Sequence, residues 1–438
     1  MKQDPYQPTP ATGTDNQPRK ADKYIWAIYL ALLAISVVEL YSASSREVQA
    51  SNVFGPLVRH GMMLLFGFGI TLGLSRMKFK WLIPMTNLIV IVALFIGFYV
   101  MFKGQIINGA RRSMSLLGIS LQSSELLKLA CVLFIAKTIA FNQERGGVTT
   151  KGVIYCAAFV LLCSFILFSQ GLTNTLLLMG VSVSMMLVGG IQWKKLGYVI
   201  VAYGIIGSAG MIYKANMAHE ESPGETAVIV ATGQNSKGEA QTTNRFTTQL
   251  NRVERWLGVG DSIPKYAQPI TAENRQEMYS YMAQANGSWH GVLPGNSRET
   301  ARLPLAFSDY IYAIIVEDWG FLGGFILLCL YLCLLGRAGA IAARCRSAFP
   351  TLLIMGMAVM IVLQALFHMA IVTGVFPVSG QPLPLISKGG SSILVTSIAF
   401  GIMLSVSRSA ANVNDRPKVI KAEIADLPSG MTAENPLL

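Results

Sequence analysis

Ten apolar segments, each about as long as a helix that crosses a lipid bilayer, constrain this chain more than any other feature. A spanning helix needs roughly 17–25 predominantly apolar residues. With 52% apolar and 13% charged residues, the 438-residue chain is also far too apolar for a soluble protein of this length. We therefore predict an all-α, polytopic membrane protein with ten transmembrane helices. The segments lie at 24–42, 57–75, 80–102, 124–142, 152–169, 172–191, 196–214, 307–336, 350–373 and 389–408.

Lysine and arginine residues gather in alternate connections between these segments, from Lys20 and Lys23 to Arg416 and Lys418. By the positive-inside rule this side is the cytoplasm, so both termini are predicted to be cytoplasmic. Topology thus accounts for the formal net charge of +12, which gives no indication of a nucleic-acid partner. Arg111 and Arg112 fall on the opposite side, and this exception marks the pair for attention.

The apolar segments define a membrane domain at about 24–410. Residues 1–23 are polar and are predicted to be a disordered cytoplasmic tail, and 411–438 a second cytoplasmic tail. The largest hydrophilic connection, about 215–306, is predicted to be extracytoplasmic. At roughly ninety residues it is short for a large core of its own, so we expect an irregular cap over the bundle with one helical piece at 247–257.

A carboxylate stands where this hydrophilic connection turns into the eighth apolar segment. Asp309 lies 28 residues before Arg337, and a helix of that length spans roughly 42 Å, more than the roughly 30 Å hydrocarbon core. The sequence therefore predicts Asp309 at the outer mouth of the bundle. A carboxylate at membrane depth is usually functional, but an acid at the first turn of a helix also caps it. Position alone leaves both interpretations open.

A second charged motif opens the fourth apolar segment. Glu125 and Lys128 are three residues apart, so they share a helix face and can neutralise each other. The pair could be structural, although a buried ion pair adds little stability. Within a membrane such a pair also marks a polar pathway.

Two glycine-rich stretches are predicted to lie outside regular helices. Residues 287–297, which include Asn296 and Ser297, have glycines spaced for tight turns or for close approach to a ligand; a turn-rich loop would look similar. Residues 374–392 hold three prolines and four glycines and cannot be regular helix. This stretch could be a simple outer loop, but Lys388 and Ser391 suit a phosphate-bearing ligand.

Together and in this order, over about residues 24–410, these motifs resemble the SEDS family (shape, elongation, division and sporulation), the FtsW/RodA-type membrane glycosyltransferases that polymerise peptidoglycan. The sequence departs from the family pattern at Leu305 and Phe307, at His368 and at Lys388, and in the run 170–175, where the family usually has Pro-Asp-x-Gly-Thr. The matching segments are Tyr41–Ser44, Asn108–Arg112, Ser124–Lys128, Gly287–Ser297, Leu303–Ala313 and Pro377–Ser392.

The resemblance implies an inverting glycosyl transfer that joins the disaccharides of lipid II at the outer leaflet of the bacterial cytoplasmic (inner) membrane. Asp309 would be the general base on the acceptor hydroxyl. Arg111, Arg112, Lys128 and Lys388 would stabilise the leaving pyrophosphate, and a divalent cation, Mg²⁺ or Mn²⁺, could share this task. Glu125 matches a cavity residue of the family.

The family also implies partners. These are a class B penicillin-binding protein, which is a transpeptidase, and, for a division-type member, other divisome membrane proteins. The polar tails favour the division type over the elongation type.

Two other functions are compatible with the same residues. A lipid II flippase would share the cavity and the substrate, but it predicts matched, broken half-helices in the two halves of the chain, and we find none in the sequence. A non-catalytic scaffold for the transpeptidase is the third hypothesis. The six cysteines and four histidines show no disulfide framework and no metal-ligand spacing.

Overall fold

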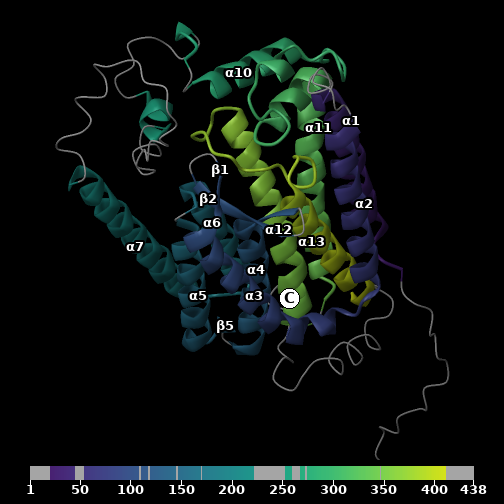
Figure 1. Cartoon of the computed structure of the whole chain (residues 1–438). Coiled ribbons are helices and arrows are strands. Elements are labelled where there is room, and N and C mark those ends of the chain that lie inside the picture. Colours follow the sequence, from purple (N-terminus) through teal and green to yellow (C-terminus); the bar gives the residue numbers. More distant parts are fainter. Residues whose placement is uncertain are drawn as a thin grey trace, which may run out of the picture.

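The computed structural model is a bundle of long helices with a smaller layer over one end (Figure 1). Both predicted tails lie largely or wholly outside the residues that the structure describes. These residues are 20–44, 54–107, 110–116, 119–144, 147–168, 170–220, 252–258, 267–271, 274–345 and 347–410.

Each of the ten predicted apolar segments contains a helix. Seven of these helices, α1–α3, α5 and α11–α13, are long and apolar enough to cross a membrane. The helix α6 is shorter, at 17 residues, and α4 carries charged side chains, so the count of ten spans stays a prediction. The ten helices are α1 (Lys23–Ser44), α2 (Phe54–Arg76), α3 (Leu82–Lys103), α4 (Ser123–Phe141), α5 (Thr150–Phe168), α6 (Leu172–Val188), α7 (Trp193–Glu220), α11 (Ile311–Ala342), α12 (Ala348–Val372) and α13 (Gly390–Ser409).

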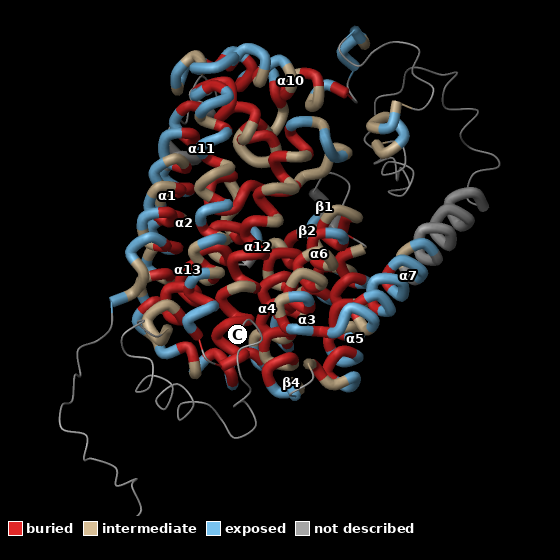
Figure 2. Tube along the Cα trace, turned by 180° about the vertical axis from the view of Figure 1, so that it is seen from behind, coloured by how far each residue is buried: buried red, intermediate tan, exposed pale blue. Residues whose placement is uncertain are grey.

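The helix α12 forms the centre of the bundle. It packs against α4, α6, α11 and α13, and the middle of the molecule is buried in Figure 2. The helix α7 instead projects from the bundle and exposes apolar side chains such as Val201 and Ile205. An apolar helix exposed in this way suits contact with lipid acyl chains.

Short strands qualify the all-α prediction. Strands β1 (Gln105–Ile107), β2 (Ala110–Leu116) and β3 (Ile119–Gln122) form an antiparallel sheet in the order β1-β2-β3 between α3 and α4. A two-residue strand pair, β4 (Gln143–Glu144) and β5 (Gly147–Val148), follows α4. From Ser113 to Gln122 polar and apolar residues largely alternate, a period-two pattern that favours a strand. The fold is mostly helical rather than purely so.

The layer over one end of the bundle is formed by the described residues between α7 and α11, and we call it the outer layer. It is more regular than expected. Helix α10 (Arg275–Gly287) packs across α11, and the 3₁₀ helix η4 (Glu299–Ala301) follows it. Helix α10 was not predicted from the sequence, and its buried face includes Met278 and Ala283. Of the helical piece predicted at 247–257, residues 252–257 are helical and 247–251 lie outside the described part of the chain. The preceding helix, α7, ends at Glu220 rather than at 214.

The long helix α11 is broken within its outer third. Gly320 has φ 71° and ψ −174°, a conformation that favours glycine. The loop after α10 occupies the break, where the Val292 N–H donates to the Glu317 carbonyl at 2.9 Å and the Phe321 N–H donates to the Ser288 carbonyl at 2.8 Å. These bonds satisfy the backbone groups that the break leaves unpaired, and they fasten the outer layer to the bundle.

Candidate active site

Asp309 lies in a run of turns that ends just before α11, so it is not a residue of the helix itself. Its backbone N–H donates to the Leu305 carbonyl at 3.0 Å, and Leu305 has a positive φ of 59°. On either side Ala306 and Tyr310 are buried in a small apolar cluster beneath α10. The half-buried Asp309 is therefore held by buried neighbours. Burial, reinforced by nearby carboxylates, raises the pKa of the Tyr310 hydroxyl, which stays neutral beside it.

A cavity of about 210 Å³ opens at this carboxylate. Three parts of the chain that are far apart in sequence form its walls: the sheet, the turn run before α11, and the loop between α12 and α13. The lining residues are Ser113, Ser120, Gln122, Leu305, Ser308, Asp309, Gly380, Pro382, Lys388, Gly389, Gly390 and Ser391.

A second cavity, of about 330 Å³, shares Ser120, Ser308 and Lys388 with the first. It reaches toward α2, where Arg59 and His60 line it. The His60 side chain is buried and pairs with the Ser36 hydroxyl at 3.0 Å. Neither residue of α2 was predicted from the sequence. The two cavities share lining residues, and we refer to them together as the cleft. Asp309 lines the first cavity, and Arg59 and His60 line the second.

Lys388 joins the two sides of this cleft. Its backbone N–H donates to the Phe307 carbonyl at 2.9 Å, and its Nζ atom lies 4.2 Å from the centre of the Phe307 ring, a cation–π contact. The preceding Ser387 hydroxyl donates to the Ser308 carbonyl at 2.6 Å. The loop that carries Lys388 is thus bound to the turn run that carries Asp309.

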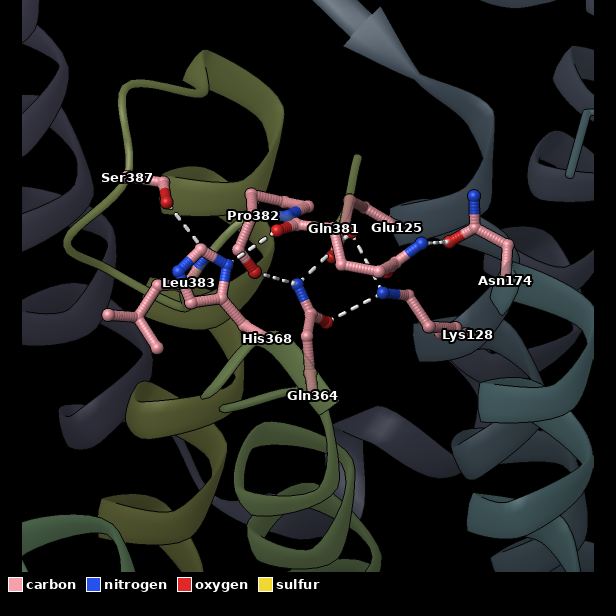
Figure 3. A network of polar contacts seen from close by, with 9 residues as sticks. All are labelled: Glu125, Lys128, Asn174, Gln364, His368, Gln381, Pro382, Leu383 and Ser387. Atoms are coloured by element: carbon pink, nitrogen blue, oxygen red, sulfur yellow. Dashed lines mark hydrogen bonds and ion pairs between the residues drawn. The ribbon is translucent and has the colours of Figure 1, made fainter. Parts of the chain in front are cut away.

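A buried polar network supports the same loop from within the bundle (Figure 3). Lys128 Nζ donates to Glu125 Oε1 at 2.8 Å and to Gln364 Oε1 at 2.6 Å. The Gln364 amide donates to the Pro382 carbonyl at 3.1 Å. The predicted Glu125–Lys128 contact is confirmed, and both side chains are buried. Neither residue lines the two cavities; they contact the loop through Gln364.

A second branch of polar contacts fixes the beginning of the loop. The His368 ring Nδ1 pairs with the Gln381 carbonyl at 2.6 Å, and the Gln381 side chain donates to Asn174 Oδ1 at 2.8 Å. Tyr331 donates to the Pro384 carbonyl at 2.7 Å. The sequence did not predict Gln364, Gln381 or Tyr331 as site residues. Isolated amides in or beside apolar segments could have suggested the first two, because such groups require partners when buried.

The remaining predicted site residues lie elsewhere. The Ser297 hydroxyl donates to the Glu317 carboxylate, and the Asn296 side chain donates to the Val292 carbonyl at 3.1 Å. Both therefore belong to the loop that fills the break in α11, and neither lines the two cavities. Arg111 and Arg112 form part of β2, the strand whose Ser113 lines the cleft, but their side chains lie outside the described part of the structure.

The described residues contain no group of three His, Cys, Asp or Glu side chains that could hold a metal ion. The cleft does offer oxygen ligands, namely the Asp309 carboxylate and the hydroxyls of Ser308 and Ser391. Mg²⁺ is commonly bound by one or two carboxylates together with substrate phosphates. The lining thus fits a divalent ion only when a phosphorylated substrate supplies further ligands.

A family model described as "Cell cycle protein", for FtsW, RodA and SpoVE, matches residues 22–412. The chain belongs to this family. Stage V sporulation protein E of Bacillus subtilis is 28% identical over 400 residues, which cover 88% of this chain and 97% of that protein. The probable peptidoglycan glycosyltransferase FtsW of Trichlorobacter lovleyi is 27% identical over 396 residues, 88% of this chain and 93% of the relative.

Two solved structures share the fold. A chain from a peptidoglycan synthase complex that coordinates polymerization and crosslinking superposes with a TM-score of 0.64 at 21% identity, covering 89% of this chain and 98% of that one. The rod shape determining protein RodA of Thermus thermophilus superposes with a TM-score of 0.59 at 21% identity, over 90% and 98% of the two chains.

Two departures from the usual family pattern contact each other. Phe307 and Lys388 form the cation–π pair described above. His368 is fully buried and uses its ring to bind the loop backbone. These three residues therefore contact the segments that line the cleft, and the chain keeps the carboxylate of Asp309.

Proposed function

We propose that this protein is a peptidoglycan glycosyltransferase that joins the disaccharide units of lipid II into glycan strands. The observation that carries the proposal is the cleft that places the Asp309 carboxylate and the Lys388 side chain in one lining. Relatives named as peptidoglycan glycosyltransferases that match most of the chain support it. The division type remains the favoured member.

In the proposed reaction Asp309 acts as the general base. Its carboxylate takes the proton of the acceptor sugar hydroxyl as that oxygen attacks the anomeric carbon of the donor, and the bond to the lipid pyrophosphate breaks. Attack opposite the leaving group inverts the configuration. The segment that carries Asp309 is bonded to the loop that carries Lys388, which favours a fixed distance between the base and the leaving group.

Cationic groups at the cleft would stabilise the leaving pyrophosphate, because negative charge develops there in the transition state. Lys388 is the first candidate, because its side chain lines the same cavity as Asp309. Arg111 and Arg112 are further candidates. A divalent ion, Mg²⁺ or Mn²⁺, when bound would neutralise phosphate charge. Glu125 and Lys128 are proposed to act through the loop, by holding Pro382 through Gln364.

The proposed setting is the bacterial cytoplasmic (inner) membrane, with the cleft on the outer side and both termini in the cytoplasm. A class B penicillin-binding protein is the proposed partner, in keeping with the related synthase complex that coordinates polymerization with crosslinking. Other divisome membrane proteins would join this pair. Contact is expected at the outer layer and the outer helix ends.

The test is polymerisation of lipid II by the purified full chain together with its transpeptidase, with products separated on a gel. Asp309→Asn preserves shape but removes the base, and should lower the rate by about 10²–10⁴-fold. Glu254→Gln, a change of an exposed carboxylate in the outer layer, should leave the rate unchanged. Normal polymer from the Asp309 variant would refute the assignment of the base. If the wild-type protein moved lipid II across vesicle membranes but never polymerised it, the flippase hypothesis would replace the polymerase hypothesis.

A further inference from the structure

A third cavity, of about 270 Å³, lies at the other end of the bundle from Asp309. It is enclosed by the end of α2, the 3₁₀ helix η2 (Phe79–Trp81) and the end of α13. Since α13 begins in the wall of the catalytic cleft and runs for 20 residues, the two sites are about 30 Å apart. The lining residues are Arg76, Met77, Lys78, Phe79, Lys80, Ser405, Arg408 and Ser409.

Half of this lining is cationic, and no carboxylate belongs to the part of it that the structure describes. Lys and Arg residues are expected at this end of the bundle by the positive-inside rule. That rule accounts for their presence but not for the convergence of four on one cavity. Lys151 and Arg344, which the same rule predicts, do not line it.

The cavity walls are held together without any ligand. Arg408 Nη1 donates to the Ser75 carbonyl at 3.0 Å, and the Ser405 hydroxyl donates to the Met77 carbonyl at 2.6 Å. One turn earlier in α13, Gly401 faces Leu74 so closely that a Cβ atom at Gly401 would lie 2.7 Å from the Leu74 Cβ. The cations of residues 76–80 and of residue 408 are therefore brought together by close packing of α2 on α13.

A neighbouring carboxylate is already engaged. The backbone N–H of Asp22 donates to the Ser407 hydroxyl at 3.0 Å, which places Asp22 beside the end of α13. Its carboxylate receives hydrogen bonds from Arg337, a cation outside the cavity. The Asp22 carboxylate is thus bonded to a cation outside the cavity.

We propose that this cavity binds the phosphate group of an anionic glycerophospholipid in the adjacent leaflet. Guanidinium groups match phosphate oxygens in pairs, and ammonium groups add positive charge. Basic pockets between helices on the cytoplasmic side are a recurring form of lipid recognition. Trp81 of η2 is 59% exposed beside the cavity, a placement typical of the membrane interface. A free phosphate ion would be recognised by the same chemistry.

The test compares thermal unfolding of the detergent-purified full chain with added phosphatidylglycerol, phosphatidylcholine or inorganic phosphate. Phosphatidylglycerol should raise the Tm and the other two should not. The double variant Arg76→Gln/Lys78→Gln should need about tenfold or more phosphatidylglycerol for the same rise in Tm. Lys151→Gln/Arg344→Gln, which removes two cations outside the cavity, should not.

Three results would overturn the proposal. Equal stabilisation by both lipids would exclude recognition of the anionic group. Stabilisation by inorganic phosphate that matches phosphatidylglycerol would assign the cavity to a free anion. If both double variants lost the stabilisation by phosphatidylglycerol to the same extent, the effect would be one of net charge and not of this cavity. None of these results depends on polymerase activity, so the proposal stands or fails separately from the proposed function.

Discussion

At the scale of single residues, the cleft depends on side chains that bind the backbone of the loop between α12 and α13. The Ser387 hydroxyl accepts a hydrogen bond from the backbone N–H of Leu383. The side chains of Gln364 and Tyr331 donate to the backbone carbonyls of Pro382 and Pro384. Lys388 adds an aromatic contact with Phe307. Because this loop has no regular backbone ladder, these side chains supply partners that secondary structure would otherwise provide.

Phe307→Leu should lower polymerisation by up to about tenfold while the protein remains folded, because a partly desolvated cation–π contact is worth about 1–2 kcal/mol. Without the ring, Lys388 would be less well fixed in the cleft. Rates of lipid II polymerisation and the Tm should both be measured. Phe95→Leu, at a ring that is 71% exposed on α3, is the control and should polymerise normally. Equal rates for the two variants would contradict a positioning role for Phe307.

At the scale of elements, the break in α11 determines how the outer layer is attached. Two segments approach there at backbone distance: a Cβ atom at Gly320 would lie 2.3 Å from the Trp289 carbonyl oxygen, and one at Gly291 would lie 2.2 Å from the Asp318 carbonyl oxygen. Only glycine fits such contacts, and both residues also have a positive φ. The break is therefore a built feature of the helix.

Gly320→Ala should destabilise the protein by at least about 2 kcal/mol, since the new methyl group requires both a strained φ and displacement of the Trp289 backbone. Gly336→Ala provides a matched control in the same helix, because no atom lies within 4 Å of the position of its Cβ. That variant should be neutral or slightly more stable. Thermal unfolding in detergent measures both. Similar Tm values for the two variants would show that α11 can straighten at little cost.

At the scale of the whole molecule, one acid connects the ends of three helices. Asp22 precedes α1, bonds through its carboxylate to Arg337 of α11 and through its backbone to Ser407 of α13. Burial opposes ionisation of Asp22, but hydrogen bonds from Arg337 and from the backbone N–H groups of Ile25 and Tyr24 outweigh it and lower the pKa below 3.8. Folding therefore favours the carboxylate.

Asp22→Asn should lower the Tm by a few degrees at pH 7, in keeping with about 1 kcal/mol for a partly exposed ion pair. A lowered pKa stabilises the fold above the ordinary value of 3.8, and this contribution is lost as pH falls through the folded-state pKa. The Tm difference between wild type and variant should thus be constant from pH 7 to about pH 5 and shrink below about pH 4. A difference that persists undiminished in acid would show that the charge of Asp22 is not responsible.

How far the sequence could predict the site differs from residue to residue. The contact between Glu125 and Lys128 followed from their spacing on one helix, and the irregular loop after α12 followed from its prolines and glycines. The sheet after α3 and helix α10 were missed, because short elements outside the apolar segments leave weak periodic signals. Asn296 and Ser297 were predicted as site residues from a glycine-rich pattern, but its glycines, such as Gly291, instead permit close backbone contacts at the break in α11.

The sequence by itself determined the helical membrane class, the approximate limits of the long helices and the position of Asp309 at a helix entrance, because apolar length and local turn chemistry are properties of neighbouring residues. Only the tertiary structure decided what surrounds that carboxylate. Ser120, Asp309 and Lys388 come from segments separated by 189 and 79 residues, and packing of α12, α13 and the sheet brings them into one lining. Contacts over such separations depend on which surfaces exclude solvent together, and no local pattern encodes that choice.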